Sequence, residues 1–478
     1  MATGKFSENE INGRGDLEKP LITTGENNEH YGSDENGSIG MVLFSTFVAV
    51  CGAFEFGSCV GYSAPTQAAI REDLGLSLAE FSMFGSILTI GAMIGAVTSG
   101  RLADLIGRKG AMRLSASFCV TGWLAVYFSK GALSLDVGRF STGFGIGVLS
   151  YVVPIFIAEI APKNLRGGLT TLNQLMIVIG QSVAFLIGTV ITWRSLALTG
   201  LVPCIFLFVG LSFIPESPRW LAKVGHQEEF QAALRKLRGK NADITTEAAE
   251  ILEYIETLES LPKATVGDLF QKKYIRAVMI GVALMVFQQF GGINGISFYA
   301  SETFALAGLS SGKTGTIAYA CLQVPITFLG AILMDKTGRR VLLMLSSSGT
   351  FLGCFLAGSS FYLREQDLYP EWRPILAVAG VLIFIGSFSI GMGAGPWVIM
   401  SEIFPINIKG VAGSLVVLVN WLGAWTVSYT FNFLMAWSTY GTFYIYSGFS
   451  IMTIIYTAKF IPETKGKTLE EIQACINS

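Results

Sequence analysis

The sequence predicts an all-α membrane protein in which twelve transmembrane helices form two pseudo-symmetric six-helix bundles. Three observations lead to this fold class. The 478 residues are 51% hydrophobic and only 14% charged, whereas a soluble domain carries about 25% charged residues. Apolar stretches of about 20 residues recur, the length that a helix needs to cross a bilayer. Short motifs of the first half return in the second half in the same order.

The apolar pattern divides the chain into five parts. Residues 1–39 are polar, so we expect a disordered cytoplasmic tail without a cleavable signal peptide. Residues 40–214 form the first bundle, with spans at 41–63, 81–100, 111–129, 133–157, 168–190 and 196–214. Residues 215–274 form a polar linker with short amphipathic helices near 227–237 and 247–258. Residues 275–461 form the second bundle, with spans at 275–298, 314–334, 340–362, 374–400, 411–435 and 440–461, and 462–478 form a second tail.

Basic residues in the short loops predict the orientation. They gather in alternate loops, which the positive-inside rule places in the cytoplasm together with the linker and both termini. These residues are Arg101, Arg108, Lys109, Arg113, Lys163, Arg166, Lys336, Arg339, Arg340 and Lys409.

Three motifs occur once in each half. The pairs are Asp104-Leu-Ile-Gly-Arg108-Lys109 with Asp335-Lys-Thr-Gly-Arg339-Arg340, residues 159–167 with 402–410, and Pro215-Glu216-Ser217 with Pro462-Glu463-Thr464. A parallel duplication is typical of two-lobed transporters whose halves are related by an axis along the membrane normal.

The repeated motifs place charges at the cytoplasmic ends of helices. Carboxylates and cations can pair there with water partly excluded. We expect networks that close this side in one state and break in the other, a two-state element; the alternative is that the charges only set topology. The residues are Arg101, Asp104, Arg108, Glu159, Arg166, Glu216, Arg219, Asp335, Arg339, Arg340, Glu402, Lys409 and Glu463.

The combined motifs resemble the sugar porter family of the major facilitator superfamily over residues 40–465. They comprise residues 100–109, Arg139, 159–166, 215–219, 288–294, 395–397, Asn420-Trp421 and 462–466. The short first external loop and the N-terminal tail look most like the plant early-responsive-to-dehydration-six-like monosaccharide carriers. The resemblance implies transport of a small neutral sugar, such as glucose, fructose or xylose, by alternating access across a lipid bilayer. We expect the chain to work as a monomer.

A sugar site needs amide groups for the hydroxyls and an aromatic face for the ring. Such amides should face a water-filled cavity, because unpaired amides in lipid are costly. Gly291-Gly292 can break the seventh span and re-aim its amides. The resemblance implies sugar contacts by Gln174, Gln181, Gln288, Gln289, Asn294, Trp397, Asn420 and, where relatives often carry Asn, Gln323. The alternative for each amide singly is a hydrogen bond between helices.

The residues of the first and fourth spans bear on the energy source of transport. Proton-coupled members of the family carry an aspartate in the first span near the arginine of the fourth span. Arg139 supplies the arginine, but Cys59 occupies the aspartate position, and a buried thiol does not replace a carboxylate as proton carrier. This favours facilitated diffusion, or uniport. Glu55 lies one turn earlier on the same face, so proton coupling through Glu55 is the alternative.

Several other classes do not fit the sequence. The net charge of −1 gives no field for nucleic acid. The spans show no nucleophile with a base and no metal cluster, so we expect no enzyme, no cofactor and no metal site. We interpret the seven cysteines as small buried hydrophobic residues, not as a disulfide framework or a metal site. A sugar sensor that does not transport is a further alternative, disfavoured by the short C-terminal tail.

The N-terminal tail suggests a location. Leu17, Leu21 and Ile22 form a Leu-x-x-x-Leu-Ile sequence in an acidic stretch, which resembles dileucine sorting signals. We therefore expect the vacuolar membrane, with the plasma membrane as the second choice.

Overall fold

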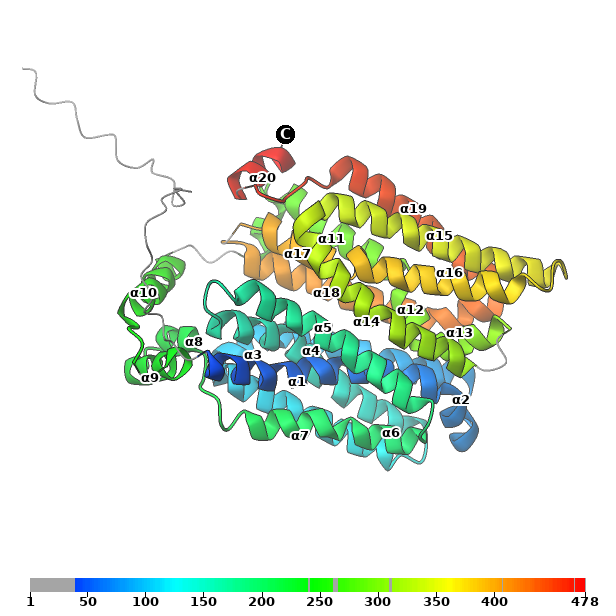
Figure 1. Cartoon of the computed structure of the whole chain (residues 1–478), viewed down its shortest axis with the longest axis horizontal. Helices are drawn as coiled ribbons and strands as arrows, with labels where there is room; N and C mark the ends of the chain where they lie inside the picture. Colours follow the sequence, from blue (N-terminus) through cyan, green and yellow to red (C-terminus); the bar gives the residue numbers. More distant parts are fainter. Residues whose placement is uncertain are drawn as a thin grey trace, which may run out of the picture. The chain divides into compact units, whose positions relative to one another are not determined.

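The computed structural model describes residues 39–239, 241–260, 265–308, 312–405, 407–467 and 469–477. These residues are helical, and no strand occurs among them. Residues 37–478 form one compact unit. Its long helices run side by side (Figure 1). Leu17, Leu21 and Ile22, which we expect to form a sorting signal, lie outside the described residues.

The first bundle contains the six expected spans. Its helices are α1 (Gly40–Gly61), α2 (Ser63–Leu74), α3 (Leu78–Tyr127), α4 (Ala132–Ile160), α5 (Arg166–Gly188), α6 (Trp193–Thr199) and α7 (Leu201–Gly210). The second and third spans are assigned to a single helix of 50 residues, α3, because their connection has almost no loop. Gly107 breaks its helical path with φ 79° and ψ 170°, a conformation that suits glycine.

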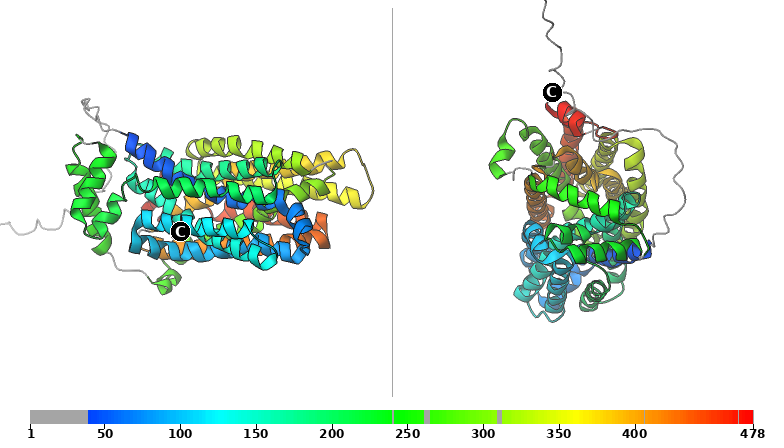
Figure 2. Two further views of the ribbon diagram at one scale, coloured as in Figure 1. Left: turned by 90° about the horizontal axis from the view of Figure 1, so that it is seen from below. Right: turned by 90° about the vertical axis from the view of Figure 1, so that its left-hand side faces the viewer.

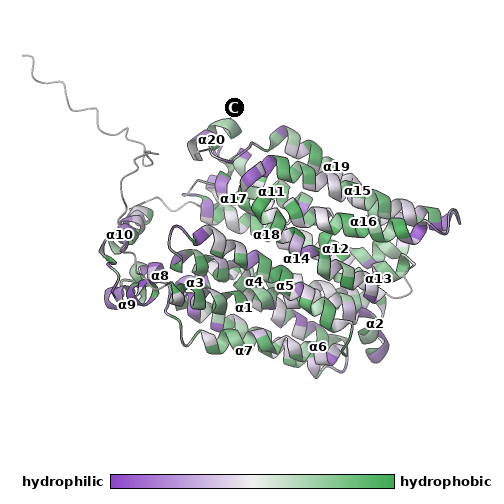
Figure 3. Cartoon of the chain, viewed as in Figure 1, coloured by the Kyte–Doolittle hydropathy of each residue, from purple (hydrophilic) through white to green (hydrophobic). Residues whose placement is uncertain are grey.

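The linker folds into short helices, as its amphipathic pattern predicts. These are α8 (Pro218–Lys223), α9 (Gln227–Arg238), α10 (Thr245–Ser260) and the 3₁₀ helix η1 (Val266–Phe270). They cluster at one end of the bundles, which we call the linker end (Figure 1). Figure 3 shows the hydrophilic residues concentrated on these helices and near helix ends, while hydrophobic residues dominate the long helices.

The second bundle repeats the pattern, but two of its spans are broken. Its helices are α11 (Ile275–Phe290), α12 (Ile293–Phe298), α13 (Ala300–Leu306), α14 (Gly312–Thr337), α15 (Arg339–Glu365), α16 (Arg373–Ser387), η2 (Phe388–Met392), α17 (Gly395–Ile403), α18 (Lys409–Trp437), α19 (Thr439–Phe460) and α20 (Leu469–Asn477). The expected break of the seventh span is confirmed between α11 and α12. The tenth span bends at η2, a π-helical turn, and α17 follows with Pro396 in its first turn.

The described helices account for twelve spans. Ten segments are long and apolar enough to cross a membrane, and one of them, α3, contains two spans. The twelfth is α19, which has 22 residues and buries a polar face that includes Thr442, Ser447, Ser450, Thr453 and Thr457. Because these hydroxyls lower its hydropathy, this helix is recognised by its place in the bundle.

Glycines let α3 and α4 pack closely. A Cβ added at Gly143 or Gly147 would lie 2.2 Å from the backbone oxygen of Leu88 or Ala92. Small residues at helix interfaces are the usual means of close approach in membranes, where lipid competes with apolar side chains for contact.

The two bundles meet along two main helix pairs, α3 with α18 and α5 with α14. Figure 1 shows the two bundles side by side, and in the left view of Figure 2 the first bundle lies in front of the second. One hydrophobic cluster continues from the first bundle into the second, including Tyr62 and Phe81 on one side and Tyr299 and Phe431 on the other. Each bundle also has its own apolar cluster.

Candidate functional site

Gln289 is the centre of a cluster of amides in the second bundle. Its Nε2 donates to Oδ1 of Asn420 on α18 at 2.6 Å. Its Oε1 accepts from the side chain of Asn294 on α12. The contact between Gln289 and Asn294 depends on the helix break between α11 and α12, where Gly292 has φ 95°. Gln288 faces elsewhere and donates to the carbonyls of Met392 and Gly393.

A second polar cluster joins the two bundles. Gln181 on α5 donates to the hydroxyl of Tyr319 on α14 at 3.5 Å. Gln323, one turn further along α14, donates to Oγ of Ser182 at 2.7 Å. Tyr319 also shares a 2.7 Å hydrogen bond with Ser297. The structure therefore places Gln181 and Gln323 at one interface between the bundles.

Two expected sugar contacts lie apart from these clusters. Gln174 is half-buried on α5, and no described residue forms a side-chain hydrogen bond with it. Trp397 is half-buried and packs against the apolar cluster of the second bundle. Neither side chain is brought to the amides by a described hydrogen bond.

Sequence reasoning missed three side chains of these clusters. They are Ser182, Ser297 and Tyr319. Tyr319 lies four residues before Gln323, on the same helix face, and this spacing is a signal that could have identified it. The two serines have no distinctive sequence signal, because serine is common inside membrane helices.

Glu55 and Arg139 are both fully buried, but they do not pair with each other. Oε1 of Glu55 accepts from the indole Nε1 of Trp123 at 2.6 Å and from the thiol of Cys59 at 3.2 Å. Its Oε2 has no described partner, and Cys119 and Cys204 place their sulfur atoms within 4.8 Å.

Arg139 binds uncharged groups. Nη1 donates to the backbone carbonyl of Cys59 at 2.8 Å, and Nη2 donates to Oγ of Ser63 at 2.6 Å. The guanidinium also lies over the rings of Tyr62 and Phe84, at 5.5 and 5.1 Å from their centroids. Arg139 therefore forms no ion pair with Glu55.

A network of charged side chains lies at the linker end of the first bundle. Arg108 forms an ion pair with Glu159 at 2.8 Å and another with Asp104 at 3.2 Å. Glu216 accepts from the backbone N–H of Lys109 at 3.0 Å. Ser217 donates to Glu159 at 2.5 Å, so the network continues into the linker.

The second bundle repeats this arrangement. Arg339 pairs with Glu402 at 3.0 Å. Glu463 accepts from the backbone N–H groups of Arg339 and Arg340 at 3.0 and 3.1 Å, at the start of α15. Gly338, with φ 95°, makes the turn that precedes them. The first network joins its bundle to the linker, and the second joins its bundle to the C-terminal segment.

Other charges expected in these networks lie outside them. Lys409 donates to the carbonyl of Ser401 at 2.9 Å and does not pair with Glu402. Arg219 lies over the ring of Tyr254 at 5.4 Å. Arg101 is exposed and Arg166 half-buried, and neither forms an ion pair with a described carboxylate. The side chain of Asp335 lies outside the described residues.

The pKa values of the two equivalent carboxylates, Glu216 and Glu463, are shifted in opposite directions. Burial raises the pKa of Glu216, and the backbone N–H groups of Ser217 and Lys109 only partly oppose it. Burial also acts to raise the pKa of Glu463, but backbone N–H donors, led by Lys465 and Arg339, outweigh it and lower the pKa.

Hydrogen bonds between the bundles lie away from the linker end. Asn432 on α18 donates to Oγ of Ser82, near the start of α3, at 2.9 Å. Gln67 on α2 donates to Glu302 on α13. With the α5–α14 cluster, these contacts hold the bundles together in the half of the spans opposite the linker.

Comparison with known proteins identifies the family. The family model described as sugar (and other) transporter matches residues 31–475. Sugar transporter ERD6-like 16 of Arabidopsis thaliana is 72% identical over 461 residues, covering 96% of this chain and 95% of its own. Sugar transporter ERD6-like 7 of the same plant is 64% identical over 437 residues, covering 91% and 94%.

Solved structures of a bacterial transporter share the fold. The inward open conformation of the xylose transporter XylE from E. coli has a TM-score of 0.77 at 27% identity and covers 91% of this chain and 99% of that chain. The proton:xylose symporter XylE bound to 6-bromo-6-deoxy-D-glucose has a TM-score of 0.73, with the same identity and coverage. These relatives are transporters and not enzymes, and the chain belongs to the sugar transporter family of the major facilitator superfamily.

Proposed function

We propose that this protein carries a monosaccharide across a membrane by alternating access. The observation that carries the proposal is the cluster of Gln289, Asn294 and Asn420, with Gln181 and Gln323 at the facing interface. Amides offer both donors and acceptors, which suit sugar hydroxyls. The relatives named as sugar transporters and the sugar analogue bound to XylE support the same substrate class. Glucose, fructose and xylose are the sugars to test first.

The contacts between the bundles support a conformation that is closed on one side. Side chains join the bundles in the half away from the linker end, and the inward open XylE structure is a close match in fold. In this reading the sugar enters or leaves at the linker end, and the charge networks there stabilise each bundle as a rigid body. The orientation follows from the basic loops, with the linker end and both termini in the cytoplasm.

We further propose that transport is uniport. Arg139 donates through its two Nη atoms to a backbone carbonyl and a hydroxyl, and no described carboxylate forms an ion pair with it. A carboxylate that must release its proton during transport gains from a cation partner, and Glu55 lacks one here. The test is sugar uptake into proteoliposomes with and without a pH gradient, where equilibration without accumulation is expected in both.

Proton coupling through Glu55 is the second candidate, because one observation favours it. Its Oε2 is buried and has no described partner, and an unpaired carboxylate in a span is costly unless it has a function. Uphill sugar accumulation driven by the gradient, and abolished by Glu55→Gln, would establish coupling and exclude uniport. An unchanged Glu55→Gln carrier would assign Glu55 a structural role with Trp123.

For the location we propose the vacuolar membrane, on the basis of Leu17, Leu21 and Ile22. A fluorescent fusion should move from the vacuolar membrane to another membrane when these three residues are changed to Ala. Unchanged location in plant cells would remove this argument, while the uptake measurements would still stand.

A further inference from the structure

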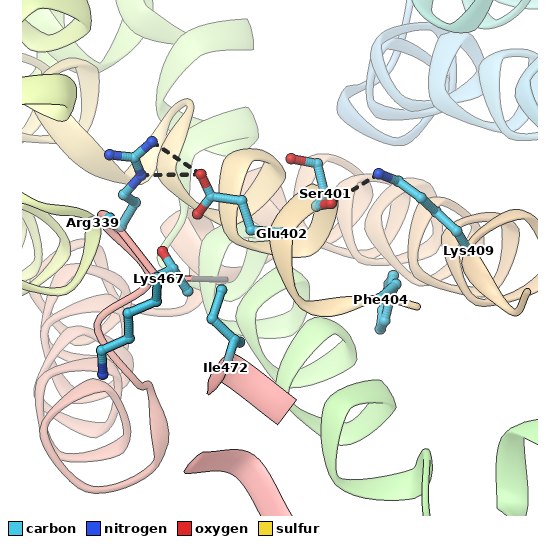
Figure 4. A pocket seen from close by; sticks show the side chains of 9 residues that line it. Arg339, Ser401, Glu402, Phe404, Lys409, Lys467 and Ile472 are labelled. Carbon is cyan, nitrogen blue, oxygen red and sulfur yellow. Dashed lines mark hydrogen bonds and ion pairs between the residues drawn. The ribbon is translucent and has the colours of Figure 1, made fainter. Parts of the chain in front are cut away.

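A pocket of about 340 Å³ lies at the linker end of the second bundle, separate from the amide clusters (Figure 4). The ends of α15, α17 and α18 and the segment that leads into α20 form its wall. The lining residues are Arg339, Ser401, Glu402, Phe404, Lys409, Thr464, Gly466, Lys467 and Ile472. Its volume is within the range of small-molecule sites.

The lining has a surplus of two positive charges. Arg339 donates from Nε and Nη2 to one oxygen of Glu402, so this pair is neutral by itself. The ammonium of Lys409 donates to the carbonyl of Ser401 at 2.9 Å, and that of Lys467 lies 3.9 Å from Sγ of Cys475. Both contacts are to uncharged atoms, and neither lysine pairs with a carboxylate among the described side chains.

A buried hydroxyl in the same wall lacks a partner. Thr464 is only 4% exposed, and its Oγ1 forms no hydrogen bond with a described residue. Buried polar atoms are normally satisfied, so the hydroxyl favours a ligand with acceptor oxygens. The N-terminus of α18, a helix of 29 residues that begins at Lys409, adds a further positive potential at this wall.

We propose that this pocket binds a phosphate ester. A phosphate monoester carries nearly two negative charges at neutral pH and several acceptor oxygens, which matches the two lysines and the hydroxyl of Thr464. Lys467 is exposed, so its long side chain can turn toward the pocket. The source of the phosphate is either a soluble sugar phosphate or a phospholipid headgroup at the membrane surface.

The pocket gives the ligand a means to affect the carrier. Ile472 and Ile476 of α20 are 3% and 8% exposed because they pack onto the second bundle. A phosphate held between Lys467 and Lys409 would link the segment before α20 to the start of α18. The ligand would thereby stabilise the docked position of α20.

The binding experiment uses the full-length protein in nanodiscs of phosphatidylcholine. Titration with inorganic phosphate and with glucose 6-phosphate should show saturable binding, and the ester should bind more tightly than glucose. Lys467→Gln should weaken binding roughly tenfold or more, because it removes a charge-assisted contact. The matched control is Lys465→Gln, since Lys465 is also exposed but does not line the pocket.

A second arm distinguishes the sources. Nanodiscs doped with phosphatidylinositol 4-phosphate test retention of the lipid by native mass spectrometry. Loss of retention in Lys467→Gln would identify the headgroup as ligand, and loss of glucose 6-phosphate binding alone would identify the soluble ester. Thr464→Val, which is close in shape, provides a second variant if Lys467→Gln does not fold. The proposal is wrong if the wild type binds neither probe saturably, or if both lysine variants lose binding equally.

Discussion

At the residue scale, Gln289 connects the amides that we assign to the sugar. It donates to Asn420 and accepts from Asn294, so it holds both side chains in place before a sugar arrives. Preorganised polar groups of this kind lower the entropy lost on binding. Gln289 is itself only 6% exposed, which fixes its own orientation.

Replacing Gln289 by Leu should therefore impair sugar binding strongly. The change leaves the buried amide of Asn420 and the half-buried amide of Asn294 without their partner, at about 1–3 kcal/mol for each unsatisfied buried group, and it removes a contact for the sugar. We expect the KM for uptake to rise roughly tenfold or more. Proteoliposome uptake measures this, and Gln174→Leu is the comparison, because Gln174 lies outside both clusters. Equal effects of the two variants would contradict the assignment.

At the element scale, the turns of the repeated motifs show how the halves differ. Glu463 caps the start of α15 through backbone N–H donors, whereas Glu216 is more deeply buried beside the kink in α3. The motifs are alike in sequence, so the difference in pKa direction comes from the tertiary surroundings of each carboxylate.

Neutralising these two carboxylates should therefore have opposite effects on the stability of the fold at pH 7. The lowered pKa of Glu463 means that its charged form stabilises the fold above the ordinary glutamate pKa, and that this stability is lost as the pH falls through the folded pKa. The raised pKa of Glu216 has the opposite effect. The stability that its neutral form contributes to the fold is lost as the pH rises. Glu463→Gln should lower the unfolding temperature at pH 7, and this loss should shrink as the pH falls below the ordinary glutamate pKa.

Glu216→Gln is the matched control for that measurement. At pH 7 it should leave the unfolding temperature unchanged or raise it, because a neutral amide avoids the desolvation of the charge. Thermal unfolding in one detergent, across the same pH series, compares both variants. A larger loss in Glu216→Gln than in Glu463→Gln at pH 7 would contradict the pKa directions.

The glycines of α4 give a prediction at the same scale. Gly143→Leu places side-chain atoms where the backbone oxygen of Leu88 already lies within 2.2 Å of the Cβ position. Because backbone cannot yield as a flexible side chain can, we expect a loss of several kcal/mol and little folded protein. Gly413→Leu, at a position with no atom within 4 Å, should fold normally in fluorescence-detected size-exclusion chromatography.

At the scale of the whole molecule, transport requires the two bundles to separate at the end that is closed here. Ser82 and Asn432 join them across this end, with a 2.9 Å hydrogen bond. Alternating access moves the two bundles as bodies around a central site. A covalent cross-link between the bundles at this end should therefore trap the carrier with its linker end open.

Cross-linking tests this directly. A Ser82→Cys, Asn432→Cys double variant treated with a short thiol cross-linker should lose sugar uptake, while each single variant treated alike retains it. A cleavable cross-linker should restore uptake after reduction. Exposed Cys321 and Cys475 should be replaced by Ser in the background used. Full uptake by the cross-linked protein would exclude movement at this interface.

The sequence by itself determined the helices and the architecture. A helix that crosses a bilayer must pair its own backbone hydrogen-bonding groups and be apolar along its length. Each span can therefore be predicted from its own stretch of sequence. The duplicated motifs indicated the two halves. The break at Gly291-Gly292 was also predictable, because two adjacent glycines weaken a helix.

Only the tertiary structure decided which side chains meet. Glu55 and Arg139 lie on helices that pack together, α1 and α4, yet each binds other groups, Trp123 and the carbonyl of Cys59. Lys409 likewise turns to the carbonyl of Ser401 and away from Glu402. The physical reason is that helix periodicity gives the face of a side chain but not the rotation and depth of the neighbouring helix. Those follow from packing, such as the glycine contacts of α3 with α4, which bring together residues far apart in the chain.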